Sequence, residues 1–370
     1  MAYPVLTGAV LIEANGAALN NAGQDQGSRT DNAIVVKQAR LGRLRYPYVS
    51  GQAWRRWWRE VLYADFGWPP SQVTVIQRPQ QAFTAGDPIA YEEDDLFGYM
   101  VARRRATRGR GSRSSETSDS EAGEAATESG RGTFRRVSPL KNSLLISVLP
   151  NVIERDFGHF TRNLPPDADP LLYESEHYTT CLQGVFTVSL TEAGSFEVGE
   201  MHDLSDEVLR SHQDQLQSLT ERRYRLLVEH RIKRVQDVVR ALARLRGGAH
   251  LARNLSDVTP VVALIGFLDG GNAPFQRLFA ADSNYERVNL NLERLRSILH
   301  DYRDRLLAPS GTKAIFFGYR PTVLGNEEVI LNTLNTDEIF RDHVAVSGTP
   351  QQALEAAAAA VKAVFEQYVA

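Results

Sequence analysis

Apolar residues recur along this chain in short runs that predict the strands of a buried sheet. The runs are bounded by polar or glycine-rich segments and lie at 5–12, 140–149, 184–190 and 261–268. The last run, VVALIGFL, is continuously apolar, which is typical of a strand buried on both faces. A segment rich in Gly and Asn follows the first run at 15–29 and predicts a loop.

Two other segments have the 3.6-residue period of helices. At 51–63, the preceding Ser50 is a good N-cap, and tryptophans at i, i+3 and i+4 form one apolar face that we expect to face the core. These tryptophans are Trp54, Trp57 and Trp58. At 205–246 the period continues long enough for two helices, with a break predicted near Thr220.

The order strand, helix, strand, strand, helix, strand is that of the split βαβ, or ferredoxin-like, arrangement, which RNA-recognition domains also use. The sequence therefore predicts an α+β fold built on this motif. Such a motif needs only about 80–100 residues, whereas the chain has 370, so the remainder must be insertions. The largest lies at 66–137, and a second at 150–181, rich in Asp, Pro and Tyr, suggests a protruding hairpin.

Part of the first insertion has a composition that cannot form a core. Residues 103–136 are rich in Arg, Gly, Ser and Glu and contain a single aromatic residue, Phe134. Too little apolar area is present there to offset the entropy of ordering the chain. We therefore expect a disordered loop.

Charge is balanced over the whole chain and biased locally. Lys+Arg total 42 and Asp+Glu 45, a formal net charge of −3, which argues against a uniformly basic protein but not against a basic surface. Between 32 and 59 the charged residues are all basic: Lys37, Arg40, Arg43, Arg45, Arg55, Arg56 and Arg59. The single cysteine, Cys181, argues against a disulfide framework, and neither a long apolar run nor a signal-peptide pattern occurs, so we expect a soluble, cytoplasmic protein.

The sequence contains no pattern that predicts catalysis or a cofactor. Its histidines lack metal-ligand spacing, and there is no G-x-S-x-G turn, P-loop or Gly-rich dinucleotide fingerprint. The acidic run at 92–95 could hold a hard cation, but a solvated loop face is the favoured interpretation. We therefore expect no catalytic residue, no metal and no cofactor.

Nucleic-acid binding is better supported. The Gly/Asn-rich loop can present amides to phosphate and sugar, and the helix capped by Ser50 points its positive dipole at whatever precedes it. The segment LGRLRYPY, at 41–48, interleaves basic and aromatic residues, and a second Gly loop, RGGAHLARN, lies at 246–254. Positive charge suits a phosphate backbone and aromatic rings suit base stacking. These features fit RNA or single-stranded DNA, and the residues alone do not choose between them.

Six short motifs occur in this chain, each of them once. They are LTGAVLIEANGAALNNAG (6–23), YPYVSGQAWRRWWRE (46–60), DLFGYM (95–100), RVSPLKNS (136–143), ESEHYTTCLQGVFTVSL (174–190) and GGAHLARNLSDVTP (247–260). In combination they resemble the DevR-like branch of the Cas seven family, the backbone subunits of type I CRISPR Cascade complexes, a branch usual in subtype I-B. The low-complexity segment at 103–136 interrupts the resemblance.

The resemblance implies a right-hand architecture, with an RNA-recognition-like palm, inserted fingers and a β-hairpin thumb. The palm would comprise 1–65, 137–152 and 181–330, the fingers-type insertion 66–136, the thumb 153–180, and a C-terminal segment ending in a helix 331–370. Several copies would line up head to tail along a guide RNA as a helical filament, binding its backbone without sequence preference and presenting its bases to target DNA. The implied partners are guide RNA, target DNA, further copies of this chain, and the end-capping guide-processing, large and small subunits of Cascade.

Transferred onto this sequence, the family's guide contacts would be Asn20, Asn21, Lys37, Arg40, Arg43, Arg45, Ser50, Gly51, Gln52, Arg55, Arg56, Lys141, Gly247, Gly248, His250 and Asn254. Candidates for the thumb wedge that props the guide open are Phe157, Phe160 and Leu172, and packing within the hairpin is an equal alternative for each.

Two alternatives to this function remain at the level of the sequence. Related type III backbone subunits cut RNA with an aspartate in the loop after the first strand, where this chain has Asp25 and Asp31. That loop otherwise follows the non-cleaving pattern. The alternatives are therefore a metal-dependent RNA-cleaving subunit of the type III kind, or a generic single-strand nucleic-acid-binding protein.

Overall fold

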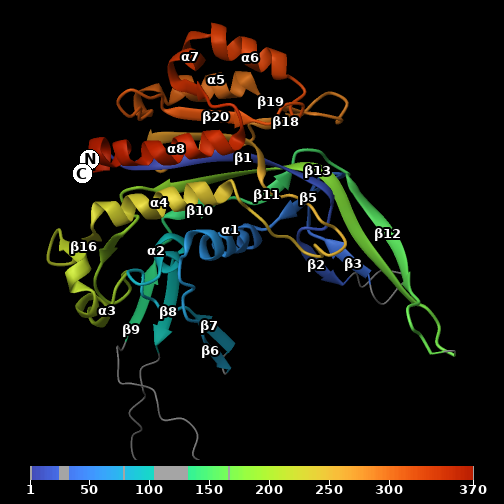
Figure 1. The fold of residues 1–370 in the computed structure, drawn as a ribbon, viewed down its shortest axis with the longest axis horizontal. Helices are drawn as coiled ribbons and strands as arrows, with labels where there is room; N and C mark the ends of the chain where they lie inside the picture. Colours follow the sequence, from blue (N-terminus) through green and yellow to red (C-terminus); the bar gives the residue numbers. More distant parts are fainter. Residues whose placement is uncertain (1, 25–32, 78–79, 104–131, 166, 370) are drawn as a thin grey trace, which may run out of the picture. The chain divides into compact units, whose positions relative to one another are not determined.

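The computed structural model describes residues 2–24, 33–77, 80–103, 132–165 and 167–369, which form two compact units (Figure 1). The first unit contains 1–68, 139–193 and 232–370. The second contains 69–138 and 194–231. Residues 194–231 thus pack with 69–138.

The first unit is built on a large mixed sheet, consistent with the predicted α+β class. Its strand order is β21-β20-β17-β1-β13-β11-β5-β4. At the centre, β1 (Pro4–Ala17) pairs antiparallel with β17 (Pro260–Asp269) on one side and β13 (Leu171–Ser189) on the other. The outer strands are β11 (Leu145–Ser147), β5 (Leu44–Val49), β4 (Gln38–Leu41), β20 (Ile315–Tyr319) and β21 (Val344–Val346).

Strand β13 is long enough to serve both the sheet and a projecting hairpin. Its last residues pair with β1 and with β10 (Leu140–Asn142), and its first residues pair with β12 (Ile153–Phe160). The β12–β13 hairpin extends away from the sheet in Figure 1. Strand β3 (Ala33–Val36) runs parallel to part of β13 and pairs with β2 (Asn21–Gln24).

Helices cover one face of this sheet. They are α1 (Gly51–Phe66), α4 (Val228–Leu242) and α8 (Pro350–Val364). The predicted tryptophan face is buried as expected: Trp54 and Trp58 stack with centroids 5.6 Å apart, and Trp58 meets Phe186 of β13 edge-on at 5.5 Å. The indole Nε1 of Trp58 donates to the Val238 carbonyl at 2.8 Å, which joins α1 to α4. A Cβ at Gly8 of β1 would lie 2.7 Å from the Phe186 ring, so glycine is needed there.

The opposite face carries a second hydrophobic layer. It contains β18 (Phe279–Ala281), β19 (Val288–Leu290), α5 (Leu292–Asp301), α6 (Glu327–Thr336) and α7 (Glu338–His343). Leu11 and Leu264 of the sheet belong to the same buried cluster as Phe279 and Leu295 of this layer. The sheet is therefore buried on both faces, as the apolar run at 261–268 predicted.

The second unit consists of short hairpins, a small sheet and short helices. Its strands are β6 (Thr74–Gln77), β7 (Gln80–Phe83), β8 (Tyr99–Arg103), β9 (Gly132–Arg136), β14 (Ser195–Glu197), β15 (Leu216–Ser218) and β16 (Arg223–Leu226). Its helices are α2 (Glu92–Phe97) and α3 (Asp206–Ser211). Among the described residues, β14, β16 and β15 form one sheet, and β6–β7 and β8–β9 form separate hairpins.

A buried ion pair lies inside the second unit. The Arg136 guanidinium is almost fully buried, donates to the Asp95 carboxylate, approaches Asp203 at 3.2 Å and stacks over the Phe196 ring at 4.6 Å. Asp95 also accepts the backbone N–H of Gly194 at 2.9 Å. The prediction that the acidic run at 92–95 is a solvated face is therefore wrong, because a distant arginine compensates one carboxylate and three of the four residues are buried.

Three local predictions are corrected by the structure. Residues 205–246 contain two helices separated by a break that includes Thr220, as predicted, but the break is much longer than expected: it holds β15 and β16, which pair across a turn in which Thr220 Oγ1 accepts the N–H of Arg223 at 3.1 Å. The strand at 140–149 is split into β10 and β11 at Ser143, whose hydroxyl accepts the Val185 N–H at 3.0 Å.

The third correction concerns loops. In 15–29, β1 continues to Ala17 and β2 occupies Asn21–Gln24, so part of the expected loop is strand. At the ends of 103–136, Arg103 belongs to β8 and Gly132–Arg136 to β9. The rest of that segment, 104–131, lies outside the described residues.

Candidate nucleic-acid interface

The start of helix α1 is anchored to the end of β1. The hydroxyl of Ser50 accepts the Ala53 N–H at 3.3 Å, which confirms the predicted N-cap. The Ser50 N–H donates to the side-chain oxygen of Asn20 at 2.9 Å, and the Lys37 N–H donates to the Asn20 carbonyl at 2.9 Å. Asn20, which follows β1, therefore joins its own segment to Lys37 and to the start of α1 at Ser50. Its side-chain oxygen already accepts a hydrogen bond from within the protein.

The loop at 247–254 packs against the same end of β1. The amide nitrogen of Asn21 donates to His250 Nε2 at 2.7 Å, and Asn254 donates to the Gly16 carbonyl at 2.9 Å. Burial, together with the charge of Arg253, lowers the pKa of His250, which agrees with a neutral imidazole that accepts from Asn21. The side-chain oxygen of Asn21 is buried and has no hydrogen-bond partner among the described residues.

Two glycines allow this loop to lie flush against the core. Gly247 and Gly248 have φ values of +155° and +130°, which residues with a Cβ rarely adopt. A Cβ at Gly247 would overlap the Trp57 ring, and one at Gly248 would lie 2.7 Å from Leu19 Cδ2. The loop that carries His250 is thus held against α1 and β1 at once.

Exposed arginines gather on the β4–β5 hairpin. Arg40, Arg43 and Arg45 are exposed, and Arg40 lies directly opposite Arg45, so both side chains are on one face. Among the described residues neither forms an ion pair. Like charges directly opposite each other on a sheet repel, so this pair favours an anionic ligand.

The two arginines after the α1 cap have different surroundings. Arg55 Nη1 donates to the Leu140 carbonyl at 2.8 Å and to Asn142 Oδ1 at 3.1 Å, and burial, with a smaller effect of neighbouring Arg59, lowers its pKa to about 10. Arg55 thus ties α1 to β10, a structural role that the sequence did not indicate. Arg56 is exposed and pairs with Glu60 at 2.8 Å. Of the other predicted contacts, Gln52 and Lys141 are exposed, and Gly51 packs on Asn142.

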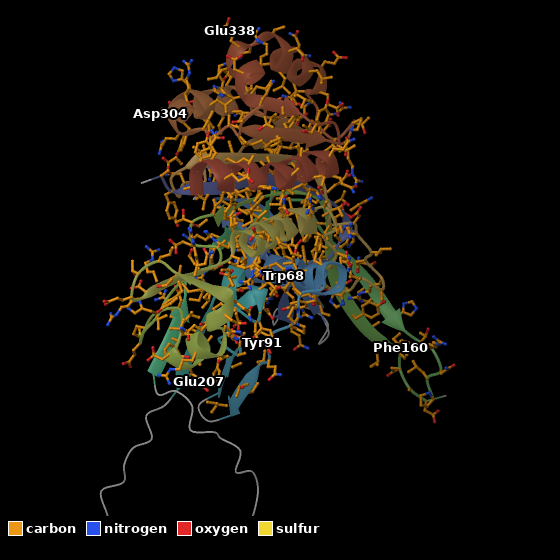
Figure 2. The ribbon with its side chains drawn as sticks, turned by 60° about the vertical axis from the view of Figure 1, so that its left-hand side comes forward. Trp68, Tyr91, Phe160, Glu207, Asp304 and Glu338 are labelled. Carbon is orange, nitrogen blue, oxygen red and sulfur yellow. The ribbon has the colours of Figure 1, made fainter. Side chains whose placement is uncertain are left out.

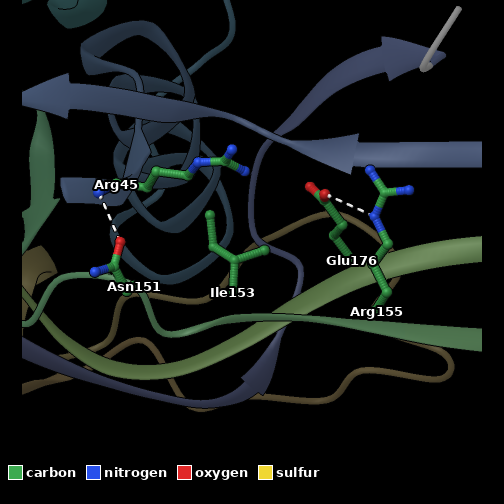
Figure 3. Close-up of a pocket in the computed structure, with 5 residues that line it drawn as sticks. All are labelled: Arg45, Asn151, Ile153, Arg155 and Glu176. Carbon is green, nitrogen blue, oxygen red and sulfur yellow. Dashed lines mark hydrogen bonds and ion pairs between the residues drawn. The ribbon is translucent and has the colours of Figure 1, made fainter. Parts of the chain in front are cut away.

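A cationic recess of about 430 Å³ lies at the base of the β12–β13 hairpin (Figure 3). It is lined by Arg45, Asn151, Ile153, Arg155 and Glu176. The Arg45 N–H donates to Asn151 Oδ1 at 3.0 Å, and Arg155 Nε donates to buried Glu176 at 3.3 Å. Among these residues the sequence singled out Arg45 as a contact. Arg155 and Glu176 come together through the hairpin register, in which they are directly opposite, and no local motif signals that pairing.

The proposed wedge residues are exposed on the hairpin. Phe157, Phe160 and Leu172 are 59%, 47% and 46% exposed, so about half of each side chain is accessible. His159 lies opposite Leu172 and Phe160 opposite Leu171. Because side chains alternate along a strand, Phe157 and Leu172 share one face, and Phe160, labelled in Figure 2, lies on the other.

The described part of the chain shows no metal-binding group. No set of three or more His, Cys, Asp or Glu side chains there could hold a metal ion. Burial, and to a lesser extent Glu13, raises the pKa of Cys181 to about 12, which disfavours the reactive thiolate. Asp25 and Asp31, on which the cleaving alternative depends, lie outside the described residues. In the same described segments, no helix is both long and apolar enough to span a bilayer.

Two solved structures have a similar fold. A chain of a "CRISPR RNA-guided surveillance complex" superposes with a TM-score of 0.51 and 12% identity, covering 96% of this chain and 99% of that one. A chain of a "CRISPR RNA-guided surveillance complex, pre-nicking" does so with a TM-score of 0.51, 11% identity and the same coverage of 96% and 99%. No protein-family model matches the sequence, and no curated protein matches it. At these identities the likeness establishes a shared fold.

Proposed function

We propose that this chain is a backbone subunit of a type I CRISPR surveillance complex, which binds guide RNA along its length and assembles with further copies of itself. The observation that carries the proposal is the fold shared with chains of RNA-guided surveillance complexes over 96% of this chain. In this proposal its partners are guide RNA, target DNA paired to the guide, and the other subunits of Cascade. It acts in the cytoplasm without catalysing a reaction.

The centre of the sheet supports an RNA-recognition-like palm. Its antiparallel order β17-β1-β13-β11, with α1 and α4 packed on one face, is the order that the split βαβ motif requires of strands 4, 1, 3 and 2. The β12–β13 hairpin takes the place of the thumb.

Four features of the first unit support the guide path. They are the Asn21–His250 pair, the N-terminus of α1, the β4–β5 arginines and the recess at the hairpin base. Guanidinium groups, amides and a helix N-terminus bind phosphates and sugars without reading bases. Such groups suit a subunit whose specificity comes from the guide's own base pairing.

The first test is to co-express the chain with a guide and sequence the RNA that co-purifies. We expect guides of uniform length, with nuclease protection recurring at regular intervals. A heterogeneous RNA population that does not change with guide expression would favour the generic single-strand-binding alternative. Cleavage of bound RNA at regular intervals, lost in Asp25→Asn or Asp31→Asn, would favour the type III alternative.

The second test asks which arginines contact phosphate. We expect Arg40→Ala and Arg45→Ala each to weaken binding of any single-stranded RNA equally and to reduce the slope of log K against log salt by about 0.7. Arg341→Ala, an exposed arginine on α7, is the matched control and should leave both quantities unchanged. Loss that depends on RNA sequence would contradict a backbone-binding surface.

A further inference from the structure

A groove of about 810 Å³ lies in the first unit between the central sheet and the layer that contains β19 and α6. The sheet contributes Glu13 of β1 and residues 179–181 of β13, and the layer contributes residues 286–288 and 322–329. None of these residues belongs to the four features of the guide path. The groove is therefore a separate surface from the proposed RNA contacts.

Negative charge dominates this groove. It is lined by four glutamates and one arginine, which are Glu13, Glu286, Glu327, Glu328 and Arg287. Within the described ranges, none of the four glutamates forms an ion pair. Oε1 of Glu327 is buried and has no hydrogen-bond partner among the described residues. Carboxylates that share a groove without compensation repel each other and repel phosphate, so they favour a positively charged ligand over RNA.

The groove also has an apolar part. Leu149, Val323 and Leu324 line it together with the carboxylates. Val329, in the first turn of α6, lines the groove too and is 57% exposed. Covering these side chains with an apolar group removes their surface from water, which stabilises a complex. The ligand that fits this groove therefore combines positive charge with apolar surface.

The positive charges of such a ligand must be spread along it. No group of three or more His, Cys, Asp or Glu side chains in the described part of the chain could hold a metal ion, so these carboxylates do not share a single ion. A peptide segment in which lysine or arginine alternates with apolar residues has separated cations and an apolar surface. Its cations can pair with the carboxylates while its apolar side chains cover Val329.

A second copy of this chain is a poor source of that segment. The basic surface that it presents is the β4–β5 hairpin, where Arg40 and Arg45 share one face. In the proposed function these arginines contact guide RNA and are not available to a protein groove. The occupant therefore comes from a different protein.

We propose that this groove binds a segment of a different protein in which lysine or arginine side chains alternate with apolar ones. The apolar side chains lie against Val323 and Val329, and the cations pair with Glu13 and Glu328. This inference adds a protein partner to the proposed function and rests on it only for the assignment of the β4–β5 arginines to RNA.

Synthetic peptides test the chemistry on the full chain. The probe is a fluorescently labelled heptapeptide of alternating lysine and valine, and the comparison peptides carry glutamate in place of every lysine or serine in place of every valine. Fluorescence anisotropy should show the probe binding at least about fivefold more tightly than either comparison peptide. Equal binding of the three peptides, or failure of the probe to bind at about 1 mM, would overturn the proposal. Spermidine that binds as tightly as the probe would identify a polyamine site instead and also overturn it.

Substitutions locate the binding in the groove. Glu328→Gln and Val329→Ser should each weaken binding of the probe about two- to fivefold, because each removes one exposed ion pair or one partly exposed apolar contact. The controls are Glu338→Gln, in the first turn of α7, and Leu331→Ser, which is 44% exposed on α6; neither residue lines the groove. Both controls should bind the probe like the unaltered protein. Equal losses in the controls would refute the assigned groove.

Two further measurements separate the partner from RNA and from a second copy. A short single-stranded RNA should leave the affinity for the probe unchanged, and saturating probe should leave the sedimentation of the protein with guide RNA unchanged. Competition by RNA would show that the groove binds nucleic acid, and dissociation of copies by the probe would show that it joins copies; either result would overturn the proposal. If no guide RNA binds the chain, the proposed function fails, while the peptide titration still decides the occupant of the groove.

Discussion

Replacing Gly247 by alanine should destabilise the protein and displace the loop that carries His250. The added methyl must avoid the Trp57 ring, which it would overlap, and the residue must keep a φ of +155°. The backbone conformation costs about 1–3 kcal/mol for a residue other than glycine. Forcing extra volume into a packed site costs about 1–3 kcal/mol more. We therefore expect the free energy of unfolding to fall by about 2–6 kcal/mol.

Gly42→Ala is the matched control for this prediction. Gly42 also has a positive φ, +60°, but a Cβ there would meet nothing within 4 Å, so alanine adds strain without overlap. We expect about 1 kcal/mol of destabilisation for Gly42→Ala. Urea unfolding followed by circular dichroism measures both variants, and RNA affinity should fall with Gly247→Ala because Asn21 loses its histidine partner. A Gly247→Ala protein no less stable than Gly42→Ala would refute the packing argument.

Three further predictions concern charged groups. Arg55→Met should lower the free energy of unfolding by about 2 kcal/mol, because it leaves a buried carbonyl without its charged donor, whereas Arg56→Ala, on the exposed side, should not change urea unfolding. The pKa of His250 is lowered in the folded protein, so the unfolded chain takes up the proton more readily. The stabilisation of the fold by neutral His250 is therefore complete above a pH of about 6.5 and is lost as pH falls below that value. His250→Gln should remove this part of the pH dependence of urea unfolding. Arg136→Met should cost about 3–5 kcal/mol, because it leaves the Asp95 carboxylate buried without the guanidinium that balances its charge; normal urea unfolding of that variant would contradict the buried pair.

Predictions from the sequence succeeded where a local pattern determines the structure. The Ser50 cap, the tryptophan face of α1 and the buried strand at 261–268 each follow from side-chain type and spacing within a few residues. The protruding hairpin predicted at 150–181 also followed from its Asp-, Pro- and Tyr-rich composition, and the structure extends its second strand into the sheet.

Predictions failed where distant residues decide the outcome. Most of the acidic run at 92–95 is buried, with Arg136 paired to Asp95, and nothing in the sequence of the run indicates that distant partner. The sequence also did not indicate the structural role of Arg55, whose guanidinium donates to Leu140 and Asn142 on another strand. In the candidate site, Asn21 and His250 were both selected, but only the fold shows that they bond each other. The recess residues Asn151 and Arg155 depend on hairpin register, which single-residue patterns do not fix.

The unbroken course of β13 makes the reach of the hairpin adjustable. Residues 182–189 of this strand are paired inside the sheet, so insertions at the opposed positions Asp156 and Ser175 would lengthen the arm without altering those pairings. Side chains alternate between faces, so adding one residue to each strand would turn Phe157 and Leu172 to the opposite side. Adding two to each strand would restore their direction and extend the arm by about 7 Å. An arm that keeps Phe157 and Leu172 on the same face can therefore change its length only in steps of two residues per strand.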